Sequence, residues 1–203
     1  NLLASNLMLV DGECAVLAAA EPTSLRLGAG LHEGFCRALL AEPVVQLRIS
    51  EPARSRVTGE QVLFFARRIA GSGDGRLVSV AEVPTSQLTT VMAQAQETPG
   101  LVLTLEREDG LLLAAMPANL PQVGRRLDPP LAAAQSTGKA MRMPARLGGG
   151  DAVVAGRPTV YRSVMVTAGL ARHAVLGETA AERTATTVMA AALALLALAA
   201  GVM

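Results

Sequence analysis

One phrase occurs twice in this chain, and that repeat constrains the fold more than any other feature. Residues 10–22 read VDGECAVLAAAEP, and residues 106–117 read EREDGLLLAAMP. Aligning Asp109-Gly110 with Asp11-Gly12 places the second copy 98 residues (109 − 11) after the first. In each copy, an apolar run follows Asp-Gly and leads to Ala-Ala and then to a proline. Because the chain has 203 residues, a repeat at this distance favours two small domains over one large domain.

The first half of the chain alternates strand-like and helix-like segments. Residues 7–22 form a predicted hairpin, whose Asp-Gly predicts a type I′ turn because both central residues of that turn need positive φ. HEGFCRALLAE favours a short helix over residues 32–42, and VVQLRIS predicts a strand over 44–50. QVLFFARRI and RLVSVAEV, residues 61–69 and 76–83, predict a second hairpin.

The second half repeats this order after a connecting helix. Thr85 or Ser86 is a candidate N-cap for a helix over QLTTVMAQAQ. Strands are predicted on both sides of Asp109-Gly110, followed by a weak helix over LAAAQSTG and a strand over AMRMPARL. DAVVAGRPT and VYRSVMVTAGL predict an outer hairpin. The pattern predicts an α+β fold with two modules, each an antiparallel sheet that carries its helix on one face.

The end of the chain predicts a membrane segment. The last 20 residues, TATTVMAAALALLALAAGVM (184–203), contain no charged side chain. About 20 apolar residues are enough to span a bilayer. Every face of such a helix is apolar or small, which a helix on a soluble domain seldom shows. We therefore expect the start of a transmembrane helix here. Because the first residue is Asn1 and not methionine, we expect the sequence to be part of a longer protein.

Composition argues against a nucleic-acid partner. The 18 basic and 17 acidic residues give a net charge of +1, and no basic run is long enough to follow a phosphate backbone. The aromatic residues are limited to Phe35, Phe64, Phe65 and Tyr161, so platforms for stacking bases are not expected.

The sequence contains no motif that predicts catalysis, a metal or a cofactor. No serine lies in a G-x-S-x-G elbow, and GSGDG and GGGD do not match the patterns of phosphate-binding loops. His32 and His173 are too far apart in sequence to suggest a zinc site. Glu106 and Glu108 alternate on a predicted strand and are expected to face water.

The two cysteines leave two interpretations open. Cys14 and Cys36 could form a disulfide in an oxidising compartment, or they could be two small buried apolar side chains.

The order of these features resembles the double Cache family, the tandem PAS-like sensor domains of bacterial histidine kinases, chemoreceptors and diguanylate cyclases. The resemblance covers about residues 7–176. It is carried by LVDGECAVLAA, LHEGFCRALL, LRISEPARSRVTGEQVLFFARRI, GRLVSVAEVPTSQL, LEREDGLLLAAMP and YRSVMVTAGLARHAVL. Each phrase is short, and their order and spacing carry the resemblance.

The resemblance implies a domain organisation. Residues 1–84 would form a membrane-distal PAS-like module, 85–100 a connecting helix and 101–176 a membrane-proximal PAS-like module. Residues 177–203 would be the juxtamembrane segment and the start of the transmembrane helix. Residues 1–183 would then be periplasmic, attached to the inner membrane, in a homodimer.

This chain departs from the family pattern in three respects. Its helix motif has Leu31-His32-Glu33 and Cys36 where Asp-Arg and Tyr-Phe pairs are more usual. The usual long N-terminal helix and first membrane span would have to precede Asn1. The residues that amino-acid-binding members use cannot be placed, since the chain has no Trp and its one Tyr, Tyr161, is in the second module. The resemblance therefore leaves the ligand open.

In PAS-like modules, the ligand lies between the sheet and the helix and loop that cover it. Here the cover would be residues 28–42, facing strands 44–50 and 61–69. The predicted ligand-binding residues are His32, Phe35, Arg37, Arg48, Ser50, Phe65 and Arg67. Arginine binds a carboxylate through two parallel hydrogen bonds and Phe offers an apolar wall, so an anionic organic acid is one candidate ligand. Alternatively, Phe64 and Phe65 belong to the core and Arg67-Arg68 to a solvated edge.

These observations predict the extracytoplasmic small-molecule sensing region of a membrane-bound signalling protein, without catalytic residues of its own. Ligand binding in the distal module would pass through the connecting helix and the C-terminal helix to a cytoplasmic output domain. One alternative is a membrane-anchored structural module of an envelope complex. A tail-anchored enzyme is a third alternative, which the motif search disfavours.

Overall fold

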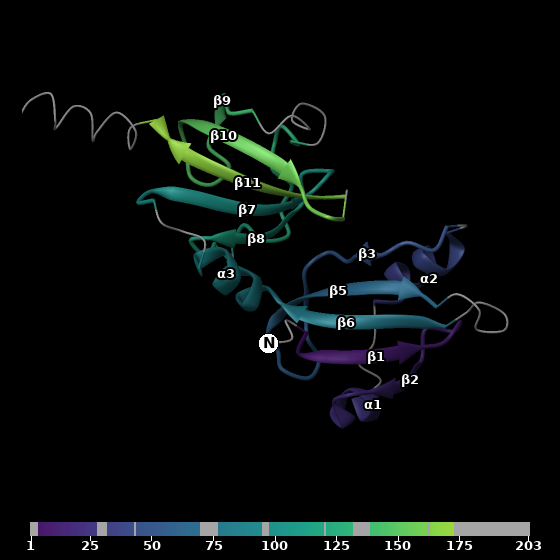
Figure 1. Cartoon of the computed structure of the whole chain (residues 1–203). Coiled ribbons are helices and arrows are strands. Elements are labelled where there is room, and N and C mark those ends of the chain that lie inside the picture. Colours follow the sequence, from purple (N-terminus) through teal and green to yellow (C-terminus); the bar gives the residue numbers. More distant parts are fainter. Residues whose placement is uncertain are drawn as a thin grey trace, which may run out of the picture.

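The computed structural model describes residues 4–27, 32–42, 44–69, 77–94, 98–119, 121–131, 139–161 and 163–172. They form two antiparallel sheets with α3 between them (Figure 1). We call the first sheet with α1 and α2 the first lobe, and the second sheet with its loops the second lobe.

The first sheet has the strand order β2-β1-β6-β5-β3, and β4 also pairs with β5. Its strands are β1 (Asn6–Val10), β2 (Val16–Ala19), β3 (Arg48–Ile49), β4 (Ala53–Arg54), β5 (Gln61–Arg68) and β6 (Val78–Pro84). The second sheet has the order β8-β7-β11-β10-β9. Its strands are β7 (Leu101–Arg107), β8 (Leu112–Met116), β9 (Met141–Pro144), β10 (Asp151–Pro158) and β11 (Val164–Ala171).

The two sheets have the same topology. In each, an initial hairpin (β1–β2 or β7–β8) forms one edge, and its first strand pairs with the last strand of the sheet, β6 or β11. That last strand pairs in turn with the strand that precedes it, β5 or β10. The sequence repeat is therefore a repeat of architecture.

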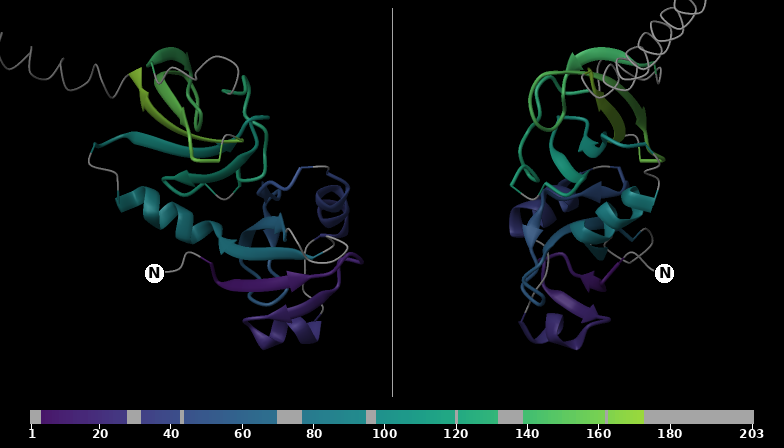
Figure 2. Two further views of the ribbon diagram at one scale, coloured as in Figure 1. Left: turned by 45° about the vertical axis from the view of Figure 1, so that its right-hand side comes forward. Right: turned by 90° about the vertical axis from the view of Figure 1, so that its left-hand side faces the viewer.

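In the described part of the chain, three helices connect and cover the sheets. α1 (Pro22–Leu27) follows β2, and α2 (Glu33–Ala41) buries Cys36 and Leu39 against the first sheet. Cys14 and Cys36 form a disulfide with a Cα–Cα distance of 6.0 Å, which joins the β1–β2 turn to α2. β6 continues directly into α3 (Thr85–Gln94), which leads toward the second lobe (Figure 2).

Successive side chains of β5 point to opposite faces of the first sheet, and both faces are packed. Val62, Phe64 and Ala66 pack with Cys36 and Leu39 beneath α2. On the opposite face, Leu63 joins a buried cluster that crosses to the second lobe. That cluster consists of Ile49, Leu63, Leu111, Leu113 and Val164, with the partly buried Phe65, Leu88 and Leu105. Apolar contact on both faces explains why β5 does not alternate apolar and polar residues.

The interior of the second lobe contains an apolar cluster of Leu131, Met143, Ala152 and Val154 and also a buried ion pair. Glu106, which is 1% exposed, accepts a hydrogen bond from Arg146 Nε at 3.0 Å and contacts Arg146 Nη2. The hydroxyls of Thr104 and Thr167 also reach Glu106, and Arg146 Nη1 donates to the Pro129 carbonyl at 2.7 Å. The expectation that Glu106 faces water is wrong, because its partner comes from a loop 40 residues further along the chain.

Several predictions of secondary structure are confirmed, and two more are corrected. The helix at 32–42 and the hairpins of β5 with β6 and of β10 with β11 are present. The strand predicted over 44–50 is limited to Arg48–Ile49. The type I′ turn predicted within residues 7–22 is wrong. Among the first turn's residues only Cys14 has positive φ (67°), and in the second turn Gly110 has φ 81° while Asp109 does not.

Local bonds explain the turns. Asp11 Oδ1 accepts hydrogen bonds from the amides of Glu13 and Ala15, which draws the first turn into a longer loop. In the second turn, Gly110 N donates to Arg107 O at 2.8 Å and Arg107 N donates to Leu111 O at 2.9 Å. This is a three-residue connection with glycine in the left-handed position.

The predicted C-terminal membrane segment and most of the predicted helix over 131–138 lie outside the described residues. Within the described ranges, no helix combines the length and the apolar character that a membrane crossing requires.

Candidate ligand-binding site

The structure distributes the predicted ligand-binding residues over two faces of the first sheet. Arg48 pairs with Ala66 and therefore shares the α2 face, where Phe35 also packs. Phe65 and Arg67 lie on the opposite face of β5 and line a separate, mainly apolar groove of about 590 Å³ beside Leu7, Val83 and Leu88. The residues therefore do not surround a single cavity, because residues i and i+1 of a strand point to opposite sides.

The other three predicted residues have structural or surface positions. Ser50 is 5% exposed, and its Oγ accepts the Phe64 amide at 2.9 Å and donates to the Glu51 carbonyl at 2.8 Å. His32 immediately precedes α2 and is exposed, and its carbonyl accepts the amides of Phe35 and Cys36. Arg37 is exposed and forms an ion pair with Glu33 one turn earlier in α2.

Two predicted residues converge on a cavity between the lobes, which we call the interlobe cleft. Its volume is about 300 Å³, at the lower end of the range for small-molecule sites. From the first lobe it is lined by Phe35, Ala38, Leu39, Glu42, Arg48 and Ile49, and from the second by Arg107, Glu108, Asp109 and Ser163. The cleft thus offers apolar contacts from α2 and charged groups of both signs.

On the first-lobe side, Arg48 is oriented by the end of α2. Arg48 Nε donates to Glu42 Oε2 at 2.9 Å, and Glu42 is the residue that terminates the helix with an extended backbone. The hydrogen bond from Arg48 holds the pKa of the Glu42 carboxyl below its usual value, so this carboxylate remains charged at neutral pH.

On the second-lobe side, Asp109 organises two arginines. Arg107 binds it through two hydrogen bonds, Nε to Oδ1 at 2.9 Å and Nη2 to Oδ2 at 2.7 Å, and Arg126 Nη2 lies 3.2 Å from Oδ2. The Leu111 amide also donates to Oδ1 at 3.3 Å. The hydrogen bonds from Arg107 are the main reason that the pKa of Asp109 lies far below its ordinary value.

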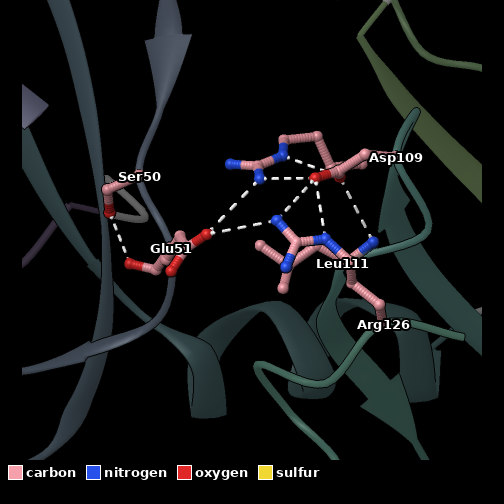
Figure 3. Close-up of polar contacts among 6 residues, drawn as sticks. Ser50, Glu51, Asp109, Leu111 and Arg126 are labelled. Carbon is pink, nitrogen blue, oxygen red and sulfur yellow. Dashed lines mark hydrogen bonds and ion pairs between the residues drawn. The ribbon is translucent and has the colours of Figure 1, made fainter. Parts of the chain in front are cut away.

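Glu51 of the first lobe reaches the same arginines. Its Oε1 lies 3.6 Å from Arg107 Nη2 and 3.7 Å from Arg126 Nη2. Figure 3 shows Glu51 facing Arg126 and Asp109, with Ser50 bonded to the Glu51 backbone behind it. An ionic contact between the lobes therefore lies beside the cleft, and Arg107 belongs to both.

Sequence reasoning did not select Glu42, Glu51, Arg107 or Asp109 for the site. Asp109 was noticed only as a turn residue of the repeated phrase, and Arg107 precedes it by two positions. No periodicity within one module can find a site whose second half comes from the other module. The described residues also contain no cluster of three or more His, Cys, Asp or Glu side chains arranged to hold a metal ion.

Comparison with known proteins identifies the fold. No protein-family model and no curated protein matches this chain. Solved structures do match. One is the extracellular domain of what is described as a histidine kinase, rpHK1S-Z16, with 21% identity over 84% of this chain and 71% of that one, at a TM-score of 0.63.

Two further matches have the same arrangement. The sensor domain of the V. cholerae histidine kinase DctB has 14% identity, covering 83% of this chain and 72% of that one, at a TM-score of 0.52. The ligand-binding domain of the Pseudomonas aeruginosa PAO1 amino acid chemoreceptor PctB, in complex with L-Arg, has 15% identity with the same coverage, at a TM-score of 0.56. The chain therefore has the tandem PAS-like fold of Cache-type extracellular sensor domains, as its sequence resemblance implied.

Proposed function

We propose that this chain is the extracytoplasmic sensing region of a membrane-bound signal-transduction protein, and that it binds a small molecule without transforming it. The observation that carries the proposal is the pair of repeated lobes in the fold of sensor domains, with a cleft between them. The Cys14–Cys36 disulfide supports an extracytoplasmic location, because such bonds persist in oxidising compartments.

The ligand in this proposal is a small molecule with a carboxylate, bound in the interlobe cleft. Arg48 supplies a guanidinium that Glu42 holds in place, and Phe35 supplies an apolar wall. A solved structure of similar fold, the chemoreceptor CtaA from Pseudomonas fluorescens, is described in complex with L-alanine, and PctB with L-Arg. The presence of both Arg48 and acidic side chains in the cleft is compatible with such zwitterions as well as with simple organic acids.

The remaining predicted residues keep a secondary place in the proposal. Phe65 and Arg67 line the groove on the other face of the sheet, and a ligand role for them stays a prediction. His32, Arg37 and Ser50 are outside the cleft lining, so we assign them no contact with the ligand there.

Signal relay is proposed to pass through α3. The Thr85 hydroxyl donates to the Gln61 carbonyl of the first sheet at 3.1 Å. The Thr89 hydroxyl lies 3.1 Å from two acceptors, the Ala115 carbonyl of the second sheet and the Thr85 carbonyl of its own helix. α3 is thus attached to both lobes and would transmit a change in their relative position. The proposal continues this path through the last strand, β11, to a C-terminal membrane helix in a homodimer.

The test is a thermal-shift screen of the purified protein with carboxylic acids, amino acids and purines, followed by calorimetry. A true ligand raises the melting temperature, and the rise grows with ligand concentration relative to Kd. Arg48→Ala is expected to weaken a carboxylate ligand about tenfold or more, whereas Arg37→Ala, a surface arginine of α2 outside the cleft, is expected to leave affinity unchanged. Absence of any ligand in the screen would contradict the sensing proposal. Equal losses in both variants would contradict the location of the site.

A further inference from the structure

Arg107 stands where the cleft and the ionic contact between the lobes meet. Its Nε and Nη2 bind Asp109, and Nη2 also faces Glu51 across the lobe boundary. Within the described part of the chain, no hydrogen bond from Arg107 Nη1 is present. The side chain is 24% exposed and lines the cleft opposite Phe35 and Arg48. A second acceptor entering the cleft can therefore reach a guanidinium that is already held in position.

The two carboxylates that face Arg107 hold it very differently. Asp109 makes a two-point contact at 2.7 and 2.9 Å, from the same turn as Arg107 itself. Glu51 lies at 3.6 Å, and its side chain is 65% exposed. Long contacts between exposed groups are weak and easily screened. A carboxylate that enters the cleft would therefore displace Glu51 and leave Asp109 in place.

Displacement of Glu51 would be felt by both sheets, because each partner is attached to a stiff element. The neighbouring Ser50 exchanges backbone and hydroxyl hydrogen bonds with Phe64 of β5, and its hydroxyl also donates to the Glu51 carbonyl. On the other side, Gly110 N bonds to Arg107 O and closes the β7–β8 turn. The backbones on both sides of the Glu51–Arg107 contact are thus hydrogen-bonded to their own sheets.

We propose that Arg107 is a specificity-determining residue for a carboxylate ligand, and that Glu51 is the internal carboxylate with which this ligand competes. This inference rests on the proposed sensing function, and it names the contact that ligand binding would change. Binding of the ligand carboxylate to Arg107 loosens the Glu51 contact between the lobes. Because such coupling is reciprocal, any change that strengthens the Glu51–Arg107 contact lowers the affinity for the ligand. Selection acts through charge and hydrogen-bond geometry, so a neutral amide of the same shape binds poorly.

The experiment measures the affinity of propionate, with propionamide as the neutral probe, by calorimetry at constant ionic strength. Glu51→Gln keeps the shape of the side chain and removes the competing charge, so propionate is expected to bind about two- to fivefold more tightly. Arg107→Gln is expected to weaken propionate about tenfold or more. The affinity for propionamide is expected to be the same in the Glu51→Gln variant as in the unmodified protein.

The matched control is Glu60→Gln, which removes the same charge from the same lobe. Glu60 lines a different cavity, beside Thr85 and Ser86, so propionate affinity is expected to stay within about twofold of the unmodified protein. Circular dichroism of Glu51→Gln is expected to match that of the unmodified protein, because the Glu51 side chain is 65% exposed.

The outcomes separate the inference from the proposed function. If propionate binds with unchanged or lower affinity in Glu51→Gln, or if Glu60→Gln tightens it equally, the inference is overturned while sensing stands. If other carboxylates of the screen bind but propionate binds neither protein, the inference is also overturned. Failure of the whole screen overturns the proposed function, and this inference with it.

Discussion

The two lobes share one strand order but fill their interiors by different means. Beneath α2, the first lobe packs apolar side chains such as Val62, Phe64 and Ala66, and a disulfide ties the helix to the sheet. The second lobe also has an apolar cluster, Leu131, Met143, Ala152 and Val154, but it adds a buried polar group: the Glu106–Arg146 pair, together with the hydroxyls of Thr104 and Thr167. The same strand order therefore fixes the position of the interior between the sheet and its cover, but it does not fix which side chains occupy that interior.

The contents of that space have functional consequences. In the second lobe, the arginine on the loop after β9 occupies the interior, and every described contact of its guanidinium is with the protein itself. In the first lobe, Arg48 and Phe35 instead reach the boundary between the lobes. The cleft therefore forms where the first lobe's cover meets the second lobe's first turn. Four predictions test this contrast, beginning with the largest expected effect.

Arg146→Ala should destabilise the protein most. It leaves the Glu106 carboxyl buried without its partner, and breaking one side of a buried pair costs about 3–5 kcal/mol. Chemical denaturation followed by circular dichroism measures the loss. Arg142→Ala is the matched control in the same lobe, because Arg142 pairs with Asp151 at an exposed site, and it is expected to cost less than about 1 kcal/mol. Equal losses for the two arginines would contradict the role of the buried pair.

Cys14→Ser combined with Cys36→Ser should be the next largest change. The disulfide closes a loop with a sequence separation of 22 residues, and loss of such a crosslink costs about 3 kcal/mol in the chain-entropy estimate. The denaturation midpoint of the double variant reports the loss, and the unmodified protein under reducing conditions should match it. If neither treatment lowers the midpoint, α2 is held by the packing of Leu39 and its neighbours alone.

The two Asp-Gly turns should respond differently to alanine. Gly110 has φ 81°, and an added Cβ would lie 2.6 Å from the Leu127 carbonyl oxygen, so Gly110→Ala should cost about 2 kcal/mol or more. Gly12 has no positive φ, and Gly12→Ala is expected to cost less than about 1 kcal/mol. At Gly59, φ is also positive (74°) but no atom lies within 4 Å of an added Cβ. Gly59→Ala therefore measures the cost of backbone strain without a steric clash. Thermal denaturation ranks the three variants, and a larger loss at Gly12 would contradict the assigned turns.

The smallest effect concerns pH. Because Arg107 lowers the pKa of Asp109 in the folded protein, its contribution to stability is present above about pH 4, the ordinary pKa of aspartate, and is lost as pH falls below it. The pair is partly exposed, so the contribution is expected to be below about 1 kcal/mol. Asp109→Asn should flatten the fall in stability between about pH 4 and 2. Asp128→Asn serves as a control at an exposed position, and an unchanged acid slope in Asp109→Asn would contradict the assignment.

Much of the fold could be predicted from local pattern. The repeated phrase predicted two lobes, the apolar spacing of 32–42 predicted α2, and the runs around β5, β6, β10 and β11 predicted their hairpins. The turn geometry was mispredicted because the Asp11 side chain bonds two amides of its own loop. Only two of the seven residues selected for the site, Phe35 and Arg48, meet in the interlobe cleft.

The sequence by itself determined the elements and their repetition, because hydrophobic period and turn residues act over a few neighbouring positions. Tertiary structure alone decided that Glu106 meets Arg146, that Cys14 bonds to Cys36, and that Glu51 faces Arg107 across the lobe boundary. These contacts join positions 22 to 56 residues apart (36 − 14 and 107 − 51). Which long-range partners meet depends on how whole sheets pack, and the free energy of that packing is shared among all residues of both lobes.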